Sequence, residues 1–173
     1  MNQVEQLLEI MSRLRDPDTG CPWDLVQDNR SILPHTIEEV YELAEAIEKD
    51  DAGAIRDELG DLLFQVVFYS RMAEETGSFS FTDVVGNIND KLRRRHPHVF
   101  GDERILTAEE QSLSWEQIKR RERREAGADN PGLLDDVSTA LPALSAAAKL
   151  QKRAATAGFD WDDPAPVLDK IQE

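Results

Sequence analysis

The sequence predicts an all-α protein built as an antiparallel helical bundle. Apolar residues recur at helical spacing along most of the 173 residues. No segment shows the sustained apolar–polar alternation between turn residues that is typical of a strand. Hydrophobic residues make up 40% of the chain, which is enough for a packed core.

The first helix is predicted near the N-terminus, where apolar residues three and four apart form one face: Val4, Leu7, Leu8, Met11 and Leu14. Residues 16–23 end this helix, because two prolines and a glycine interrupt it. A second helix is expected from Thr36 to about Lys49. Thr36–Glu39 matches a capping box, and Pro34 stands just before it.

A third helix is predicted from about Ala54 to the mid-70s, where Gly77 stops it. Its wide apolar stripe favours a place in the middle of the bundle or at a subunit interface. A fourth helix is expected after a cap at Ser80 and ends before Pro97. Its apolar residues are Val84, Val85, Ile88 and Leu92.

Two more helices are expected in the last third of the chain. Thr107–Glu110 is a second capping box, and it opens a helix with an apolar face of Leu113, Trp115 and Ile118. Residues 127–132 form a predicted linker. Residues 141–157 have a helical pattern that ends at Gly158.

The C-terminal segment repeats the N-terminal one. Gly158–Asp162 resembles Gly20–Asp24, with the tryptophans 138 residues apart, and Lys170–Glu173 corresponds to His35–Glu38. Chance similarity between two Trp-Asp loops is the alternative. We infer a first helical domain at residues 1–126, a linker and connecting helix at 127–157, and the truncated start of a second repeat at 158–173.

The charge balance limits the partners. The chain has 20 Lys and Arg against 35 Asp and Glu, a formal net charge of −15. We expect no nucleic-acid or membrane partner, because phosphate groups attract positive surfaces. An anionic small substrate stays open, since a bound cation inverts the local field. The single cysteine, Cys21, excludes an internal disulfide, and without a secretory signal or a long apolar run we expect a cytoplasmic protein.

Acidic residues form the strongest candidate site. Residues three and four apart share a helix face, so the carboxylates of the second helix line up, and Glu58 and Asp61 match this spacing on the third. A short turn joins the two helices as neighbours. Four carboxylates could therefore converge: Glu39, Glu42, Glu58 and Asp61. Each unscreened pair at ~4 Å costs about 4 kcal/mol at an effective dielectric near 20, so the cluster is a candidate site for a hard cation such as Mg²⁺.

A structural interpretation of the same acids stays open. Glu39 can be the reciprocal member of the capping box at Thr36. Glu38, Glu42 and Glu45 can form a solvated face that the helix dipole favours.

The fourth helix supplies the opposite charge. Lys91 and Arg95 are four residues apart and share a face that can clamp a polyphosphate, with Asn89 close by in sequence. Cations near a helix C-terminus are the simpler alternative. Trp23 can stack on a nucleobase or pack beside its prolines.

These motifs resemble those of a known family. Glu38–Glu42, followed after 15 residues by Glu58–Asp61, resembles the Glu-Glu-x-x-Glu … Glu-x-x-Asp signature of the all-α nucleoside triphosphate pyrophosphohydrolases, and within them the MazG proteins. Segments 14–17, 20–24, 57–68 and 94–100 are also similar to a MazG N-terminal domain. The resemblance covers essentially the whole chain, and MazG proteins commonly carry two such domains in tandem.

The resemblance implies a bundle completed by dimerisation, or by a higher homo-oligomer. It implies hydrolysis of nucleoside triphosphates, over a broad nucleotide range, to monophosphate and pyrophosphate with Mg²⁺, or with Mn²⁺ in its place. The implied metal ligands are Glu39, Glu42, Glu58 and Asp61. The implied catalytic acids are Glu38, Glu39 and Glu42, with Glu38 orienting the attacking water, and the implied substrate contacts are Asn89, Lys91 and Arg95.

The sequence departs from the family at one position. In the C-terminal MazG domain a lysine precedes the first signature glutamate by three residues. Lys170 holds that place in the second copy, but His35 holds it in the first. N-terminal MazG domains can be catalytically silent. The second hypothesis is therefore a silent dimerisation or regulatory domain of a two-domain MazG protein.

Overall fold

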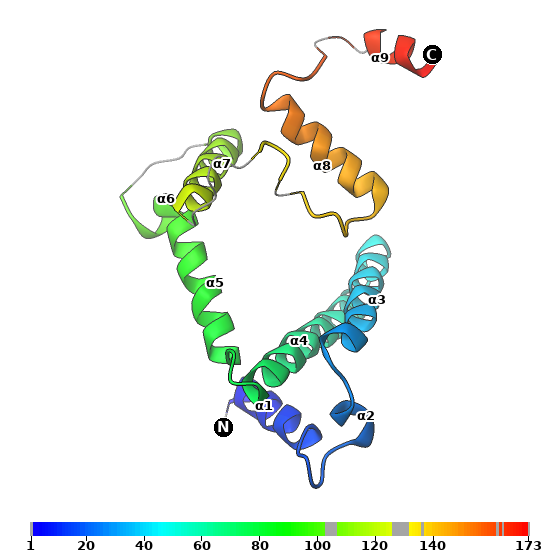
Figure 1. Cartoon of the computed structure of the whole chain (residues 1–173), viewed down its shortest axis with the longest axis vertical. Helices are drawn as coiled ribbons and strands as arrows, with labels where there is room; N and C mark the ends of the chain where they lie inside the picture. The colour runs from blue at the N-terminus through cyan, green and yellow to red at the C-terminus, as the bar shows by residue number, and fades with distance from the viewer. Residues whose placement is uncertain are drawn as a thin grey trace. The chain divides into compact units, whose positions relative to one another are not determined.

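The computed structural model describes residues 2–102, 107–125, 132–135, 137–161, 163 and 165–172. All regular structure in these ranges is helical, which confirms the all-α prediction (Figure 1). The helices are α1 (Gln3–Leu14), α2 (Pro22–Leu25), α3 (Asn29–Glu48), α4 (Ala52–Glu75), α5 (Phe81–Arg95), α6 (Pro97–Phe100), α7 (Ala108–Glu125), α8 (Ala143–Ala155) and α9 (Ala165–Gln172). The chain divides into two compact units, Met1–Asp102 and Glu103–Glu173.

Helix α4 is the centre of the first unit and packs against α1, α3 and α5. It supplies three of the five core residues, but much of its wide apolar stripe is not buried: Leu59, Leu63 and Val66 are exposed. The core residues are Met11 from α1, Ile32 from α3, and Val67, Phe68 and Met72 from α4. This core lies toward the C-terminal half of α4, so the N-terminal half of α4 is free to present polar side chains to α3.

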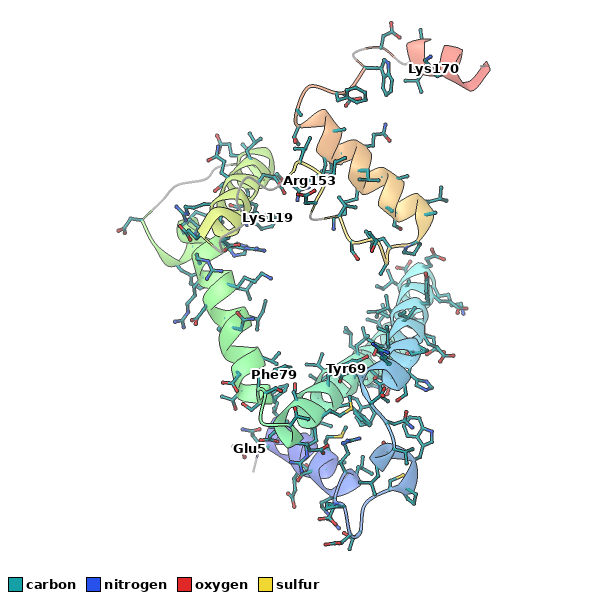
Figure 2. The ribbon with its side chains drawn as sticks, viewed as in Figure 1. Glu5, Tyr69, Phe79, Lys119, Arg153 and Lys170 are labelled. Atoms are coloured by element: carbon teal, nitrogen blue, oxygen red, sulfur yellow. The ribbon has the colours of Figure 1, made fainter. Side chains whose placement is uncertain are left out.

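The expected start of the second helix at Thr36 is wrong, because α3 begins seven residues earlier. Asp28 is the N-cap: its carboxylate accepts from the amides of Arg30 and Ser31, both at 2.8 Å. Pro34 lies inside the helix. The hydroxyl of Thr36 lies 3.0 Å from that of Tyr69 on α4, which Figure 2 labels. Thr36 therefore joins two helices and caps neither.

A short turn makes α3 and α4 a hairpin. Asp50 carries the positive φ of this turn, 52°, a conformation that aspartate tolerates better than most residues. Asp51 caps α4 by accepting from the amides of Gly53 and Ala54 at 3.0 and 3.1 Å. Figure 1 shows the two helices lying side by side, as the short connection predicts.

Helix α5 has the predicted boundaries but not a buried face. Ser80 and Asp83 form its capping box, and it ends at Arg95. None of its residues is buried, and its apolar residues Val85, Ile88 and Leu92 are exposed. Its first turn packs beside α1 and the C-terminal half of α4. The rest of α5 leads away from α4 (Figure 1).

The second unit contains α7, α8 and α9. Thr107 and Glu110 exchange the two bonds of the predicted capping box. Helix α8 is shorter than the expected 141–157, because Pro142 is its N-cap and Thr156 its C-cap. Glu116 of α7 accepts from Lys119 at 3.0 Å and from Arg153 of α8 at 2.8 Å; the two cations are labelled in Figure 2.

The predicted linker 127–132 lies outside the described residues except for Gly132. The domain boundaries drawn from the internal repeat stay a prediction. No helix in the described ranges is both long enough and apolar enough to cross a lipid bilayer.

Candidate metal centre

Three carboxylates from two helices meet between α3 and the first half of α4. Glu39, Glu58 and Asp61 each offer an oxygen, and these three oxygens lie within 4.8 Å of one another. Glu58 and Asp61 share a face of α4 because they are three residues apart, and the hairpin brings Glu39 opposite them. Within the described ranges this is the one group of three or more such side chains so arranged.

Glu42 lies beside this group. Loss of water around the carboxyl, and then the charges of Asp61 and Glu42, raise the pKa of Glu39. Glu58 adds to this effect. The pKa of Glu58 is raised by the same loss of water, and then by Glu42 and Asp61. The four predicted carboxylates therefore act on one another, although only three of them offer oxygens that lie within 4.8 Å of one another.

The capping interpretation of Glu39 is wrong. Thr36 and Glu39 both lie inside α3, whose first amides are capped by Asp28. The solvated-face interpretation holds for two other acids of this helix. Glu45 forms an ion pair with Lys49, and Glu38 is exposed, 3.8 Å from the ring of His35. The acids of α3 thus divide into a solvated set and a set that faces α4.

The donor set fits a hard divalent cation. All the ligand atoms are carboxylate oxygens, which Mg²⁺ and Mn²⁺ accept. The raised pKa values of Glu39 and Glu58 come first from loss of water and then from the neighbouring carboxylates, so part of the effect is repulsion between like charges. A cation held there would relieve the repulsion.

Helix α5 does not bring its basic residues to this cluster. Asn89, Lys91 and Arg95 lie on the part of α5 that leads away from α4 (Figure 1). In the described part of the first unit, the cluster and these residues are therefore separate. Their role in binding phosphate stays a prediction.

Trp23 lies beside the start of the acidic region. Its ring meets that of His35 edge to face, with the centroids 5.7 Å apart, and Trp23 is 51% exposed. The sequence does not predict this pair. His35 stands three residues before Glu38, where the predicted second repeat has Lys170.

Comparison with known proteins points to one family. Residues 27–100, which include all four carboxylates, match the model of the MazG nucleotide pyrophosphohydrolase domain. The chain is 52% identical over 173 residues to a nucleoside triphosphate pyrophosphohydrolase of Escherichia coli K12, covering all of this chain and 65% of the relative. It is 43% identical over 169 residues to the "Nucleoside triphosphate pyrophosphohydrolase/pyrophosphatase MazG" of Thermotoga maritima, covering 98% of this chain and 63% of the relative.

A solved structure has the same fold. The crystal structure of a mazG-related protein from Thermotoga maritima aligns with a TM-score of 0.56 at 29% identity, covering 67% of this chain and 98% of that one. The chain spans about two thirds of the length of the two sequence relatives.

Proposed function

Because this chain belongs to the MazG nucleotide pyrophosphohydrolase family, we propose that it hydrolyses nucleoside triphosphates to nucleoside monophosphates and pyrophosphate, with Mg²⁺ and over a broad range of bases. The observation that carries the proposal is the meeting of Glu39, Glu58 and Asp61 within 4.8 Å. The names of the Escherichia coli and Thermotoga maritima relatives support the reaction.

Each acid has a proposed part in this reaction. Glu39, Glu42, Glu58 and Asp61 would hold Mg²⁺, with Mn²⁺ as the alternative ion. When bound, the ion offsets the charge of the triphosphate and makes the α-phosphorus more open to attack. Glu38 lies one residue from Glu39 on the solvent side of α3, where it would orient the attacking water.

We further propose that a second copy of the chain completes the site. The exposed apolar residues of α5 form a strip, Val85, Ile88 and Leu92, that a partner would cover. The same helix carries Lys91 and Arg95 away from the cluster of its own chain. In a homodimer these cations, with Asn89, would contact the phosphates held at the partner's acids and offset the charge of leaving pyrophosphate.

The test is pyrophosphate release from a panel of nucleoside triphosphates in Mg²⁺. Glu39→Gln removes one carboxylate without changing its size, and turnover should fall by about 10²-fold or more. Glu45→Gln is the matched control, because Glu45 lies on the same helix but pairs with Lys49. Equal activity of the two variants would refute the assignment.

One observation favours a second function, a catalytically silent dimerisation or regulatory domain. His35 stands where the second copy has Lys170, and its ring contacts Trp23. A silent domain predicts that Mg²⁺ still raises the melting temperature while no triphosphate in the panel is hydrolysed. Turnover that Glu39→Gln abolishes would exclude it.

A further inference from the structure

Arg15 is buried where the loop after α1 meets α4. Its side chain is only 8% exposed, although arginine is a surface residue in most proteins. Its Nε and Nη2 donate to both carboxylate oxygens of Glu75 on α4, at 2.7–3.2 Å. Its guanidinium also lies over the ring of Phe68, 5.4 Å from the centroid. Such a bidentate, partly desolvated pair fixes the geometry of both partners.

The remaining donor of Arg15 fixes the loop. Nη1 donates to the carbonyl oxygen of Asp24 and, at 3.4 Å, to that of Gln27. These carbonyls lie on either side of the end of the short helix α2, which carries Trp23. Gln27 in turn donates from Nε2 to the carbonyl of Trp23 at 2.9 Å. Arg15 therefore ties the segment that carries Trp23 to α4.

The loop before Trp23 is closed tightly on the end of α1. The amide of Gly20 donates to the carbonyl of Asp16 and that of Cys21 to Leu14, both at 2.8 Å. A Cβ on Gly20 would lie 2.5 Å from both carbonyl oxygens, so only glycine fits. The segment is thus rigid at its start and anchored at its end.

The segment around Trp23 presents exposed aromatic rings. Trp23 meets His35 edge to face, and the ring of His35 lies 3.8 Å from Glu38. Both rings are about half exposed, which is unusual for a tryptophan whose purpose is core packing. The pair stands at the start of the stretch of α3 that carries the acids. Flat, exposed rings at such a place suit the face of a nucleobase.

We propose that Arg15 and Glu75 are positioning residues that hold Trp23, with His35, as a wall for the nucleobase of the substrate. The proposal rests on the proposed function, because the base recognised is that of the nucleotide whose phosphates the acidic cluster holds. Trp23 and His35 contact the base. Arg15 and Glu75 act only through them.

The first experiment needs no ligand. Trp115→Phe and Trp161→Phe together leave Trp23 as the one tryptophan, whose emission is excited selectively over that of Tyr41 and Tyr69. In this background, Arg15→Lys should shift the Trp23 emission to the red and increase its quenching by acrylamide, because lysine cannot bind a carboxylate and two carbonyls in fork geometry. Glu75→Gln, which keeps the shape of the side chain, should do the same in smaller measure. If circular dichroism shows that Arg15→Lys does not fold, Glu75→Gln serves as the test.

Glu74→Gln is the matched control. Glu74 is the neighbouring carboxylate of α4, pairs with Arg71 at 3.2 Å, and is more exposed than Glu75. The emission and quenching of Trp23 should be unchanged in this variant. If Arg15→Lys and Glu75→Gln also leave them unchanged, the pair does not position Trp23 and the proposal is wrong.

The second experiment compares two ligands that differ only in the base. AMP and ribose 5-phosphate are titrated into the full chain by calorimetry with Mg²⁺. Trp23→Ala and Arg15→Lys should each weaken AMP binding by about tenfold, the scale of one base stacked on an aromatic ring, and leave ribose 5-phosphate binding unchanged. A merely structural role for Arg15 predicts that both ligands weaken together, which would overturn the proposal.

The two failures can be told apart. If the wild-type chain binds AMP no better than ribose 5-phosphate, there is no base wall and this inference fails, even where pyrophosphate is released from triphosphates. If no triphosphate is hydrolysed but AMP binds more tightly than ribose 5-phosphate through Trp23, the proposed reaction fails and the wall stands.

Discussion

Replacing Glu75 by alanine should destabilise the first unit strongly, because it leaves the guanidinium of Arg15 buried without its anion. Removing one partner of a fully buried ion pair costs about 3–5 kcal/mol. The Glu75 side chain is 29% exposed, so water replaces part of the lost interaction. We therefore expect a loss of about 2–3 kcal/mol.

Urea denaturation followed by circular dichroism measures this loss. With an m-value of about 1.5–2 kcal/mol/M, the midpoint of the first unit should fall by about 1–2 M. Glu74→Ala is the control. Glu74 pairs with Arg71 at the surface of one helix, and such pairs contribute about 0.5 kcal/mol or less.

The pH dependence gives a second check on the same pair. The hydrogen bonds from Arg15 hold the pKa of Glu75 below its ordinary value of 4.5. A carboxyl with a lowered pKa in the folded state stabilises the fold above 4.5, and this contribution is lost as the pH falls through the folded value. The difference between wild type and Glu75→Ala should shrink below pH 4.5. Equal losses for Glu75→Ala and Glu74→Ala at pH 7, or a difference that persists unchanged at pH 3, would refute the reasoning.

Three further predictions follow from the acidic cluster and from α5. Mg²⁺ at 100 times its dissociation constant should stabilise the wild-type chain by about 2.7 kcal/mol in thermal melts, and a similar gain in Glu39→Gln would contradict the metal assignment. Because the pKa values of Glu39 and Glu58 are raised, the metal-free chain should lose stability as the pH rises from 4.5 through the raised values. If the stability of Glu39→Gln falls with pH as steeply as that of the wild type, the cluster is not the cause. Ile88→Asp should turn a dimer into a monomer in sedimentation equilibrium without loss of helix, since α5 buries no residue in its own chain; a dimer that survives would place the interface elsewhere.

Local signals predicted most helix ends correctly, and the failure at α3 has a clear cause. Ser80 and Thr107 cap their helices as expected, because a cap is made of residues within one turn. For α3 the sequence predicts a cap at Thr36. The structure has the cap at Asp28, since Pro34 is tolerated inside the helix and the Thr36 hydroxyl bonds to Tyr69 on α4.

Three of the four predicted members of the acidic cluster, Glu39, Glu58 and Asp61, offer oxygens within 4.8 Å of one another, and Glu42 is outside this group. Spacing of three residues places Glu58 and Asp61 on one face, and a short turn predicts that α3 and α4 are neighbours. The sequence could not say that Glu38 and Glu45 face solvent while Glu39 faces α4. That choice depends on how the two helices are rotated about their axes, which the core at Ile32, Val67 and Phe68 decides.

The sequence by itself determined the helical class, the caps at Ser80 and Thr107 and the set of candidate carboxylates, because these depend on hydrogen bonds and side-chain spacing within a few residues. The tertiary structure alone decided which distant groups meet. Arg15 and Glu75 are 60 residues apart, and no local pattern pairs them. It also decided that α5 leads away from α4 beyond its first turn (Figure 1), and Lys91 and Arg95 belong to the last turns of that helix. Such contacts are set by the packing of whole helices against one another, and packing is a property of the folded chain.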